Sequence, residues 1–210
     1  MHEHRVSASC ILSCAFRIAS RRGYSLLELM FAAALCVTLG AVAAPLLLTA
    51  VDDVRAAGAA RYLSTRLQQA RMEAVGRSAD VGVQFFRTPE GYAYAVYVDG
   101  NGNGVRTRDI QSDLDRRIGS VERLPDHFAG IDFGVLPGLP PVDAGSPAPG
   151  TDPIKLGASS ILTFTPLGTS SSGSLYLRGS RNLQYVIRIF GETGKTRVLK
   201  FDLGARQWKP

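Results

Sequence analysis

Glu28 is the first residue whose chemistry stands out, because its carboxylate lies at the head of a long uncharged stretch. No charged residue occurs from position 29 to position 51. A helix rises ~1.5 Å per residue, so ~20 residues cross the ~30 Å hydrocarbon core of a bilayer. A charge inside a membrane segment costs roughly 2.5–3.5 kcal/mol on insertion scales and usually marks a function. The sequence therefore predicts a membrane helix in which Glu28 needs a partner, with the basic pair Arg21-Arg22 ahead of it.

A second group of oxygen-bearing side chains lies in residues 99–104, which read DGNGNG. Their D-x-N-x-N-G spacing matches the first half of a calcium-binding loop. The candidate ligands are Asp99, Asn101 and Asn103. The second half of the loop does not match, because position twelve is Ile110 and the acid Asp109 comes one place early. We therefore predict a glycine-rich turn with positive φ angles and no metal site, and keep calcium binding as the alternative.

Side chains for catalysis are scarce in the rest of the chain. The three cysteines are Cys10, Cys14 and Cys36, so none lies beyond the uncharged run. His127 is the one histidine after the N-terminal segment, and we expect it in a loop or on the surface. Zinc sites and nucleophile–histidine pairs need more than this single imidazole. We therefore expect a protein without enzymatic activity and without a cofactor.

The basic character of the chain is concentrated at its start. The formal net charge is +6, and residues 1–23 contain four arginines and one acid. Without them the chain holds 20 basic and 17 acidic residues, a net charge of +3. The overall charge is therefore little evidence for a nucleic-acid partner.

The first 78 residues divide by composition into three parts. Residues 1–23 are basic and irregular, and we interpret them as a targeting leader that is cleaved. Residues 24–51 would form the membrane-spanning half of a helix, and residues 52–78 its amphipathic half. A conventional secretory signal and an unprocessed membrane anchor are the alternatives. The position of Glu28, the length of the run and Pro45 argue against the secretory signal.

The amphipathic half carries a single apolar stripe, with positions that recur at spacings of four and three. The stripe consists of Ala56, Ala60, Leu63, Leu67, Ala70 and Ala74. Its small side chains predict close packing against a sheet, and packing against a partner helix is the alternative.

Residues 79–210 predict a β-rich domain. Alternating apolar residues predict a hairpin of residues 81–85 and 92–98, with a turn at residues 88–91. Later strands are expected at residues 161–165, 174–178, 183–190 and 195–201. Residues 136–157 hold six of the eleven prolines and predict a mobile loop without regular strand pairing. The expected fold class is α+β, with a long N-terminal helix packed on an antiparallel sheet or sandwich.

The segment Gly23-Tyr24-Ser25-Leu26-Leu27-Glu28 resembles the processing site of type IV pilins and type II secretion pseudopilins. The resemblance implies that a prepilin peptidase cuts between Gly23 and Tyr24 and methylates the new N-terminus of Tyr24. Glu28 would then be the acid at the fifth mature position, and Pro45 the proline that often kinks the helix in this family. The family usually has phenylalanine where this chain has Tyr24.

The same resemblance implies an assembly role for Glu28. Cleavage would leave a positive α-amine on Tyr24, and Glu28 of a neighbouring subunit could pair with it in a filament core of low dielectric constant. The implied partners are other pilin-like subunits, the prepilin peptidase and an inner-membrane assembly platform. The implied location is the inner membrane, crossed once, with a periplasmic C-terminal domain.

Four motifs in the rest of the chain resemble the H-type pseudopilin and FimT-like family. They are RMEAVGR at 71–77, FTPLG at 164–168, GSLYL at 173–177 and GKTR at 194–197. The resemblance implies a minor pseudopilin, a non-enzymatic subunit of a type II secretion pseudopilus.

A FimT-like minor pilin that binds DNA during uptake is the alternative. The DNA-binding members have a basic Gly-Arg-x-Arg segment near the C-terminus, and here the candidate contacts are Lys195, Arg197, Lys200 and Arg206. Lys195 replaces the first arginine, so the charge stays but the bidentate fork for phosphate is lost. Phosphate contacts would make binding dependent on salt and independent of sequence. A solvated hairpin tip would explain the same residues without DNA.

Overall fold

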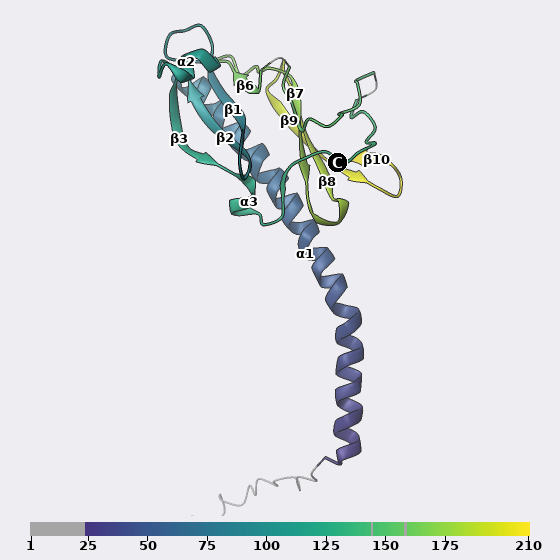
Figure 1. The fold of residues 1–210 in the computed structure, drawn as a ribbon. Helices are drawn as coiled ribbons and strands as arrows, with labels where there is room; N and C mark the ends of the chain where they lie inside the picture. The colour runs from purple at the N-terminus through teal and green to yellow at the C-terminus, as the bar shows by residue number, and fades with distance from the viewer. Residues whose placement is uncertain (1–23, 144, 158) are drawn as a thin grey trace, which may run out of the picture. The chain divides into compact units, whose positions relative to one another are not determined.

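The chain contains one long helix followed by two antiparallel sheets (Figure 1). The structure is a computed structural model that describes residues 24–143, 145–157 and 159–210. The chain divides into two compact units, residues 1–46 and 47–210, and helix α1 (Leu26–Arg77) includes residues of both.

Both ends of α1 are stabilised by local hydrogen bonds. At the start, the backbone N–H of Glu28 donates to Ser25 Oγ at 3.2 Å, so Ser25 caps the helix. At the end, Ser78 has a φ of 53°. The N–H of Ala79 donates to the carbonyl of Ala74, and that of Ser78 to the carbonyl of Val75. This pair of bonds is a Schellman motif, so the helix stops at Arg77 for a local reason.

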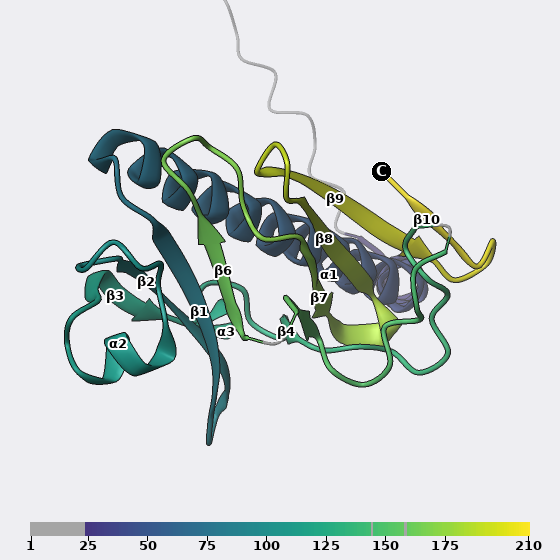
Figure 2. The same ribbon diagram turned by 90° about the horizontal axis from the view of Figure 1, so that it is seen from above.

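The apolar stripe of the helix packs on the sheets. All six predicted stripe residues are buried, and Ala59 is buried with them. They share one core with large side chains of both sheets, including Phe85, Phe164 and Ile187. Figure 2 shows this part of α1 lying along the two sheets. The prediction of a helix packed on antiparallel sheets is therefore confirmed, and the partner-helix alternative for the stripe is wrong.

The first sheet has four antiparallel strands in the order β3-β2-β1-β6. They are β1 (Val81–Thr88), β2 (Gly91–Val98), β3 (Arg116–Glu122) and β6 (Ile161–Phe164). The β1–β2 hairpin is in full register from Val81↔Val98 to Thr88↔Gly91, as the alternating pattern predicted. Helices α2 (Thr107–Gln111) and α3 (Leu124–His127) flank β3 in the chain.

The second sheet has the order β10-β9-β8-β7-β4, with β5 also paired to β7. Its strands are β4 (Asp132–Phe133), β5 (Ile154–Lys155), β7 (Gly173–Arg178), β8 (Gln184–Phe190), β9 (Lys195–Asp202) and β10 (Gln207–Lys209). The short helix η1 (Ser180–Asn182) joins β7 to β8. One face of this sheet packs on α1, and the other face carries separate small apolar clusters around Phe201 and Val186.

The proline-rich segment is attached to the second sheet. Leu136 and Leu139 are buried against Phe201. Strand β5 falls inside the segment and pairs with β7, Ile154 opposite Leu175. The prediction that this segment lacks regular strand pairing is therefore wrong at β5. Apolar residues between the prolines supply the packing, and the single short strand avoids Pro153.

Gln184 holds the start of that segment in place. Its side chain is fully buried. Its Oε1 accepts a hydrogen bond from Leu136 N at 2.9 Å, and its Nε2 donates to the carbonyls of Gly134 at 3.1 Å and Leu177 at 2.9 Å. A buried amide whose donor and acceptor are both satisfied joins neighbouring segments strongly.

Candidate functional site

The expected assembly residues lie in the first turn of α1 and in the uncharged run behind it. Tyr24 and Glu28 are both exposed. Gly23, on the other side of the expected cleavage point, lies outside the described residues. Ser25 and Glu28 have the S-x-x-E spacing of a capping box, a local signal in the sequence that indicates where the helix begins. A carboxylate in the first helical turn also interacts favourably with the helix dipole. Among residues 24–143, 145–157 and 159–210, no cation forms an ion pair with Glu28.

The uncharged part of α1 exposes an extended apolar surface. Every residue from 24 to 51 is exposed, including many large leucine, valine and phenylalanine side chains. By length and composition α1 could cross a membrane, and none of its most apolar window is buried. Pro45 lies inside the helix without ending it. Apolar surface of this extent normally contacts a membrane or another protein.

Arg71, in the second half of α1, meets two glycines from separate sequence motifs, Gly168 and Gly194. Arg71 Nε donates a hydrogen bond to the carbonyl of Gly168 at 2.8 Å. Gly168 and Gly194 have φ angles of 80° and 61°. A Cβ on Gly194 would collide with the carbonyl oxygen of Gly168 and lie 2.9 Å from Arg71 Nε. The turn at Gly168 therefore requires glycine for its backbone conformation, and the turn at Gly194 requires glycine for its backbone conformation and for space.

Polar side chains of α1 complete this attachment of the β8–β9 turn. Gln68 Nε2 donates to the carbonyl of Gly194 at 3.1 Å. The hydroxyls of Ser64 and Thr196 are 2.6 Å apart. The residues of the family-like motifs thus hold two turns of the β-domain to the helix, which is a structural role.

The basic C-terminal residues do not form one surface. Lys195 and Arg197 are exposed, and because side chains alternate along a strand they share one face of β9. Lys200 projects from the opposite face and contacts Asp53 of α1 at 2.7 Å. That hydrogen bond is the main cause that raises the pKa of Lys200 above its ordinary value. Arg206 is exposed beyond β9 and donates to the carbonyl of Gly138 at 3.3 Å.

The calcium-like segment folds as a turn around Asp99. Asp99 Oδ1 accepts from the N–H groups of Asn101 at 3.0 Å and Gly102 at 2.9 Å, and Oδ2 from Gly104 N at 2.7 Å. Burial alone would raise the pKa of Asp99, but these backbone hydrogen bonds outweigh it and lower the pKa. Asn101 uses its side-chain oxygen in the same way, to accept from Asn103 N. No group of three metal-binding side chains occurs in the part of the chain that the structure describes.

A partly buried carboxylate that was not predicted from the sequence, Glu122, joins α1 to the first sheet. Glu122 Oε2 accepts hydrogen bonds from the hydroxyls of Tyr62 at 2.9 Å and Tyr94 at 2.8 Å. Arg66 forms an ion pair with the same carboxylate. Burial is the largest cause that raises the pKa of Tyr94 far above its ordinary value. The residues come from three elements, so no local spacing in the sequence could have indicated the cluster.

His127 is exposed on α3, with its ring 5.2 Å from that of Tyr62.

Known proteins resemble this chain over different lengths. A family model described as type II transport protein GspH matches residues 59–193. Pilin-like protein PilA1 of Thermus thermophilus is 39% identical over 84 residues, which cover 40% of this chain and 52% of the relative. The chain therefore spans about half the length of this curated relative.

Two structures of the minor pseudopilin EpsH, from the type 2 secretion system of Vibrio cholerae, are also similar. They are 16% and 17% identical, cover 70% of this chain, and span 97% and 94% of the EpsH chains, each with a TM-score of 0.42. The GspH model matches well over half of the residues, so this chain belongs to the GspH family of type IV pilin-like proteins.

Proposed function

We propose that this chain is a minor pseudopilin, a non-enzymatic filament subunit of a type II protein secretion system. The observation that carries the proposal is the exposed, apolar first half of α1, which precedes the region that matches the GspH family. Exposing this apolar helix surface to water is energetically unfavourable. In a membrane before assembly, and between subunits after it, the same surface would be covered.

Processing would prepare the chain for assembly. A prepilin peptidase would cut between Gly23 and Tyr24, remove residues 1–23 and methylate the new amine. The mature chain would stay in the inner membrane through residues 24–51, with residues 52–78 and the β-rich residues 79–210 in the periplasm. An inner-membrane assembly platform would then transfer it to the filament.

Glu28 would act as the recognition charge in that transfer. In the single chain it is exposed beside the helix N-terminus. In a filament, the amine of Tyr24 and a neighbour's Glu28 would be removed from water together, and each would offset the desolvation of the other. Pro45 removes one backbone donor within the membrane segment, so the helix can bend there during packing.

Mass spectrometry of the full chain, expressed with and without a prepilin peptidase, tests the processing step. The proposal predicts a mature chain that starts at Tyr24 and carries one extra methyl group. A chain that keeps residues 1–23 in the presence of the peptidase contradicts the proposal.

The second candidate is a minor pilin that binds DNA for uptake. It is favoured by one observation, the exposed pair Lys195 and Arg197 on one face of β9. Lys200 does not add to this pair, because it is bound to Asp53. Gel shifts of the detergent-solubilised full chain at low and moderate salt test it, with Lys195→Gln/Arg197→Gln compared with Lys209→Gln. The absence of a shift at low salt removes this candidate.

A further inference from the structure

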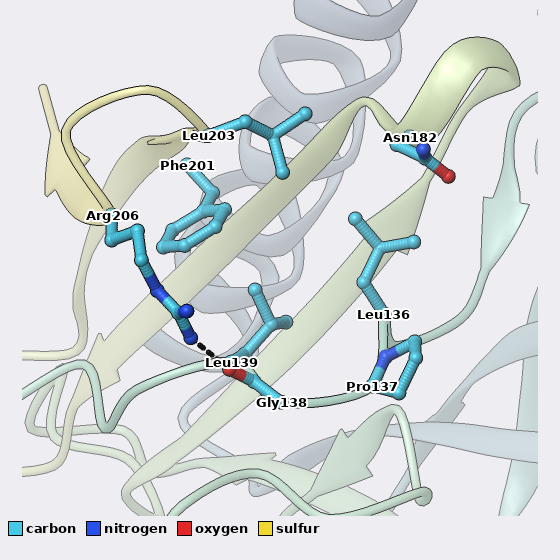
Figure 3. A pocket seen from close by; sticks show the side chains of 8 residues that line it. All are labelled: Leu136, Pro137, Gly138, Leu139, Asn182, Phe201, Leu203 and Arg206. Atoms are coloured by element: carbon cyan, nitrogen blue, oxygen red, sulfur yellow. Dashed lines mark hydrogen bonds between the residues drawn. The ribbon is translucent and has the colours of Figure 1, made fainter.

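A pocket of about 320 Å³ opens on the face of the second sheet that does not pack on α1 (Figure 3). Its apolar lining comes from Leu136, Leu139, Phe201 and Leu203, and its polar lining from Asn182 and Arg206. Leu203 is 53% exposed, in the turn between β9 and β10. Figure 3 shows the guanidinium of Arg206 beside the apolar side chains, where it donates to the carbonyl of Gly138.

The pocket lies at the end of the domain where the uncharged run of α1 stops. Arg181, next to the pocket residue Asn182, donates to Thr49 Oγ1, and its Nε lies 3.7 Å from the carboxylate of Asp52. These two helix residues enclose the last two positions of the uncharged run, 50 and 51. Arg181 and Asn182 have φ angles of 52° and 62°, so two consecutive left-handed residues form the turn that touches α1 on one side and the pocket on the other.

The chemistry of the pocket matches the surface of an anionic bilayer. Arg206 forms no ion pair with an acid in the part of the chain that the structure describes, and its one hydrogen bond leaves other guanidinium donors for a phosphate. Beside it, exposed leucine supplies the apolar half of an interfacial contact. Asp52 and Asp53 are already bound to Arg181 and Lys200, so their charge does not repel an anionic surface strongly.

We propose that this pocket docks on the membrane surface, with Arg206 bound to the phosphate of an anionic phospholipid and Leu203 inserted beside its glycerol region. The inference rests on the proposed insertion of α1 in the bilayer. Docking would fix the orientation of the β-domain relative to the membrane before the subunit enters a filament. Because filament entry removes the chain from lipid, this contact would have to break during assembly.

The single tryptophan of the chain, Trp208, provides a native probe. It packs with Leu136, Leu139 and Phe201, and its ring lies 5.1 Å from that of Phe201. The full chain is placed at one copy per nanodisc, in phosphatidylglycerol brominated near the glycerol or in phosphatidylcholine brominated at the same carbons. The proposal predicts quenching of Trp208 in the anionic discs and clearly less in the neutral ones.

Two matched pairs of variants locate the contact. Arg206→Gln should shift docking roughly fivefold toward the undocked state, and Leu203→Ser should also reduce quenching. Lys195→Gln and Leu167→Ser are the controls. Leu167 is 90% exposed and lies in a turn held by Arg71, roughly 33 Å along the helix from Thr49. Both controls should retain the quenching of the unchanged chain.

Two results would overturn the proposal. One is quenching that is equal in anionic and neutral discs, and the other is quenching that Arg206→Gln and Leu203→Ser leave unchanged. Resistance to carbonate extraction from vesicles is measured in parallel. A chain that resists extraction but shows no lipid quenching disproves the docking alone, whereas a chain that is extracted disproves membrane insertion and the docking together.

Discussion

Replacing Gln184 by leucine should destabilise the β-domain and release the segment at residue 136. The amide is fully buried and satisfies Leu136 N, Gly134 O and Leu177 O. A net hydrogen bond contributes about 1 kcal/mol, and a buried donor left without a partner costs about 1–3 kcal/mol. Leucine fills a similar volume, so little is lost through packing. We therefore expect a loss of about 2–4 kcal/mol in the free energy of unfolding.

Chemical denaturation of the full chain in detergent measures the global effect, with Gln207→Leu on the exposed strand β10 as the control. Amide hydrogen exchange measures the local effect, because Leu136 N loses its acceptor. Exchange at Leu136 should accelerate much more than exchange in the β1–β2 hairpin. A Gln184→Leu chain within about 0.5 kcal/mol of the unchanged protein, with unchanged exchange at Leu136, would refute this account of the segment.

Two further substitutions test the turns of the β-domain. Gly194→Ala should lower the free energy of unfolding by about 2–3 kcal/mol in thermal unfolding, because it adds a strained positive φ and a clash with the Gly168 carbonyl. The control Gly102→Ala, also at positive φ but in open space, should cost less. Equal costs would show that the contact between Gly194 and Gly168 is unimportant. Asp99→Asn tests how the stability of the domain depends on pH. Because the pKa of Asp99 is lowered in the folded chain, its carboxylate stabilises the fold above the unfolded-state pKa. This stabilisation is lost as the pH falls through the folded-state pKa. The stability difference between Asp99→Asn and the unchanged chain should therefore shrink below about pH 4, and a difference that stays constant from pH 7 to pH 3 would contradict the role of the turn.

The long helix and the main strands could be predicted because their patterns are local. The stripe from Ala56 to Ala74 repeats with the helical period, and the hairpin at residues 81–98 alternates with the strand period. The edge strands β3 and β10 could not be predicted in this way, since most of their side chains are exposed and carry no alternation. The packing of the proline-rich segment was missed for another reason, because it depends on Gln184, 48 positions away from Leu136.

In the candidate site, too, the local features could be predicted from the sequence and the long-range contacts could not. Ser25 and Glu28 lie three positions apart, so their capping geometry was present in the sequence. The contact of Arg71 with Gly168 joins residues 97 positions apart, and only the fold reveals why both belong to the family-like pattern. Among the basic residues, Lys200 was expected to contact DNA together with Lys195, but strand alternation and the ion pair with Asp53 place it on the other side of the sheet.

Co-isolation with the other pseudopilus subunits, after expression of the complete secretion system, tests the central claim about Glu28 most directly. The unchanged chain and Glu73→Gln should co-isolate to the same extent, because Glu73 forms an exposed ion pair with Arg77 in the second half of the helix. Glu28→Gln should reduce recovery at least about tenfold, since in the proposed filament core the amine of Tyr24 would lose its counter-charge. Equal recovery of Glu28→Gln and Glu73→Gln, with both chains processed, would contradict the account.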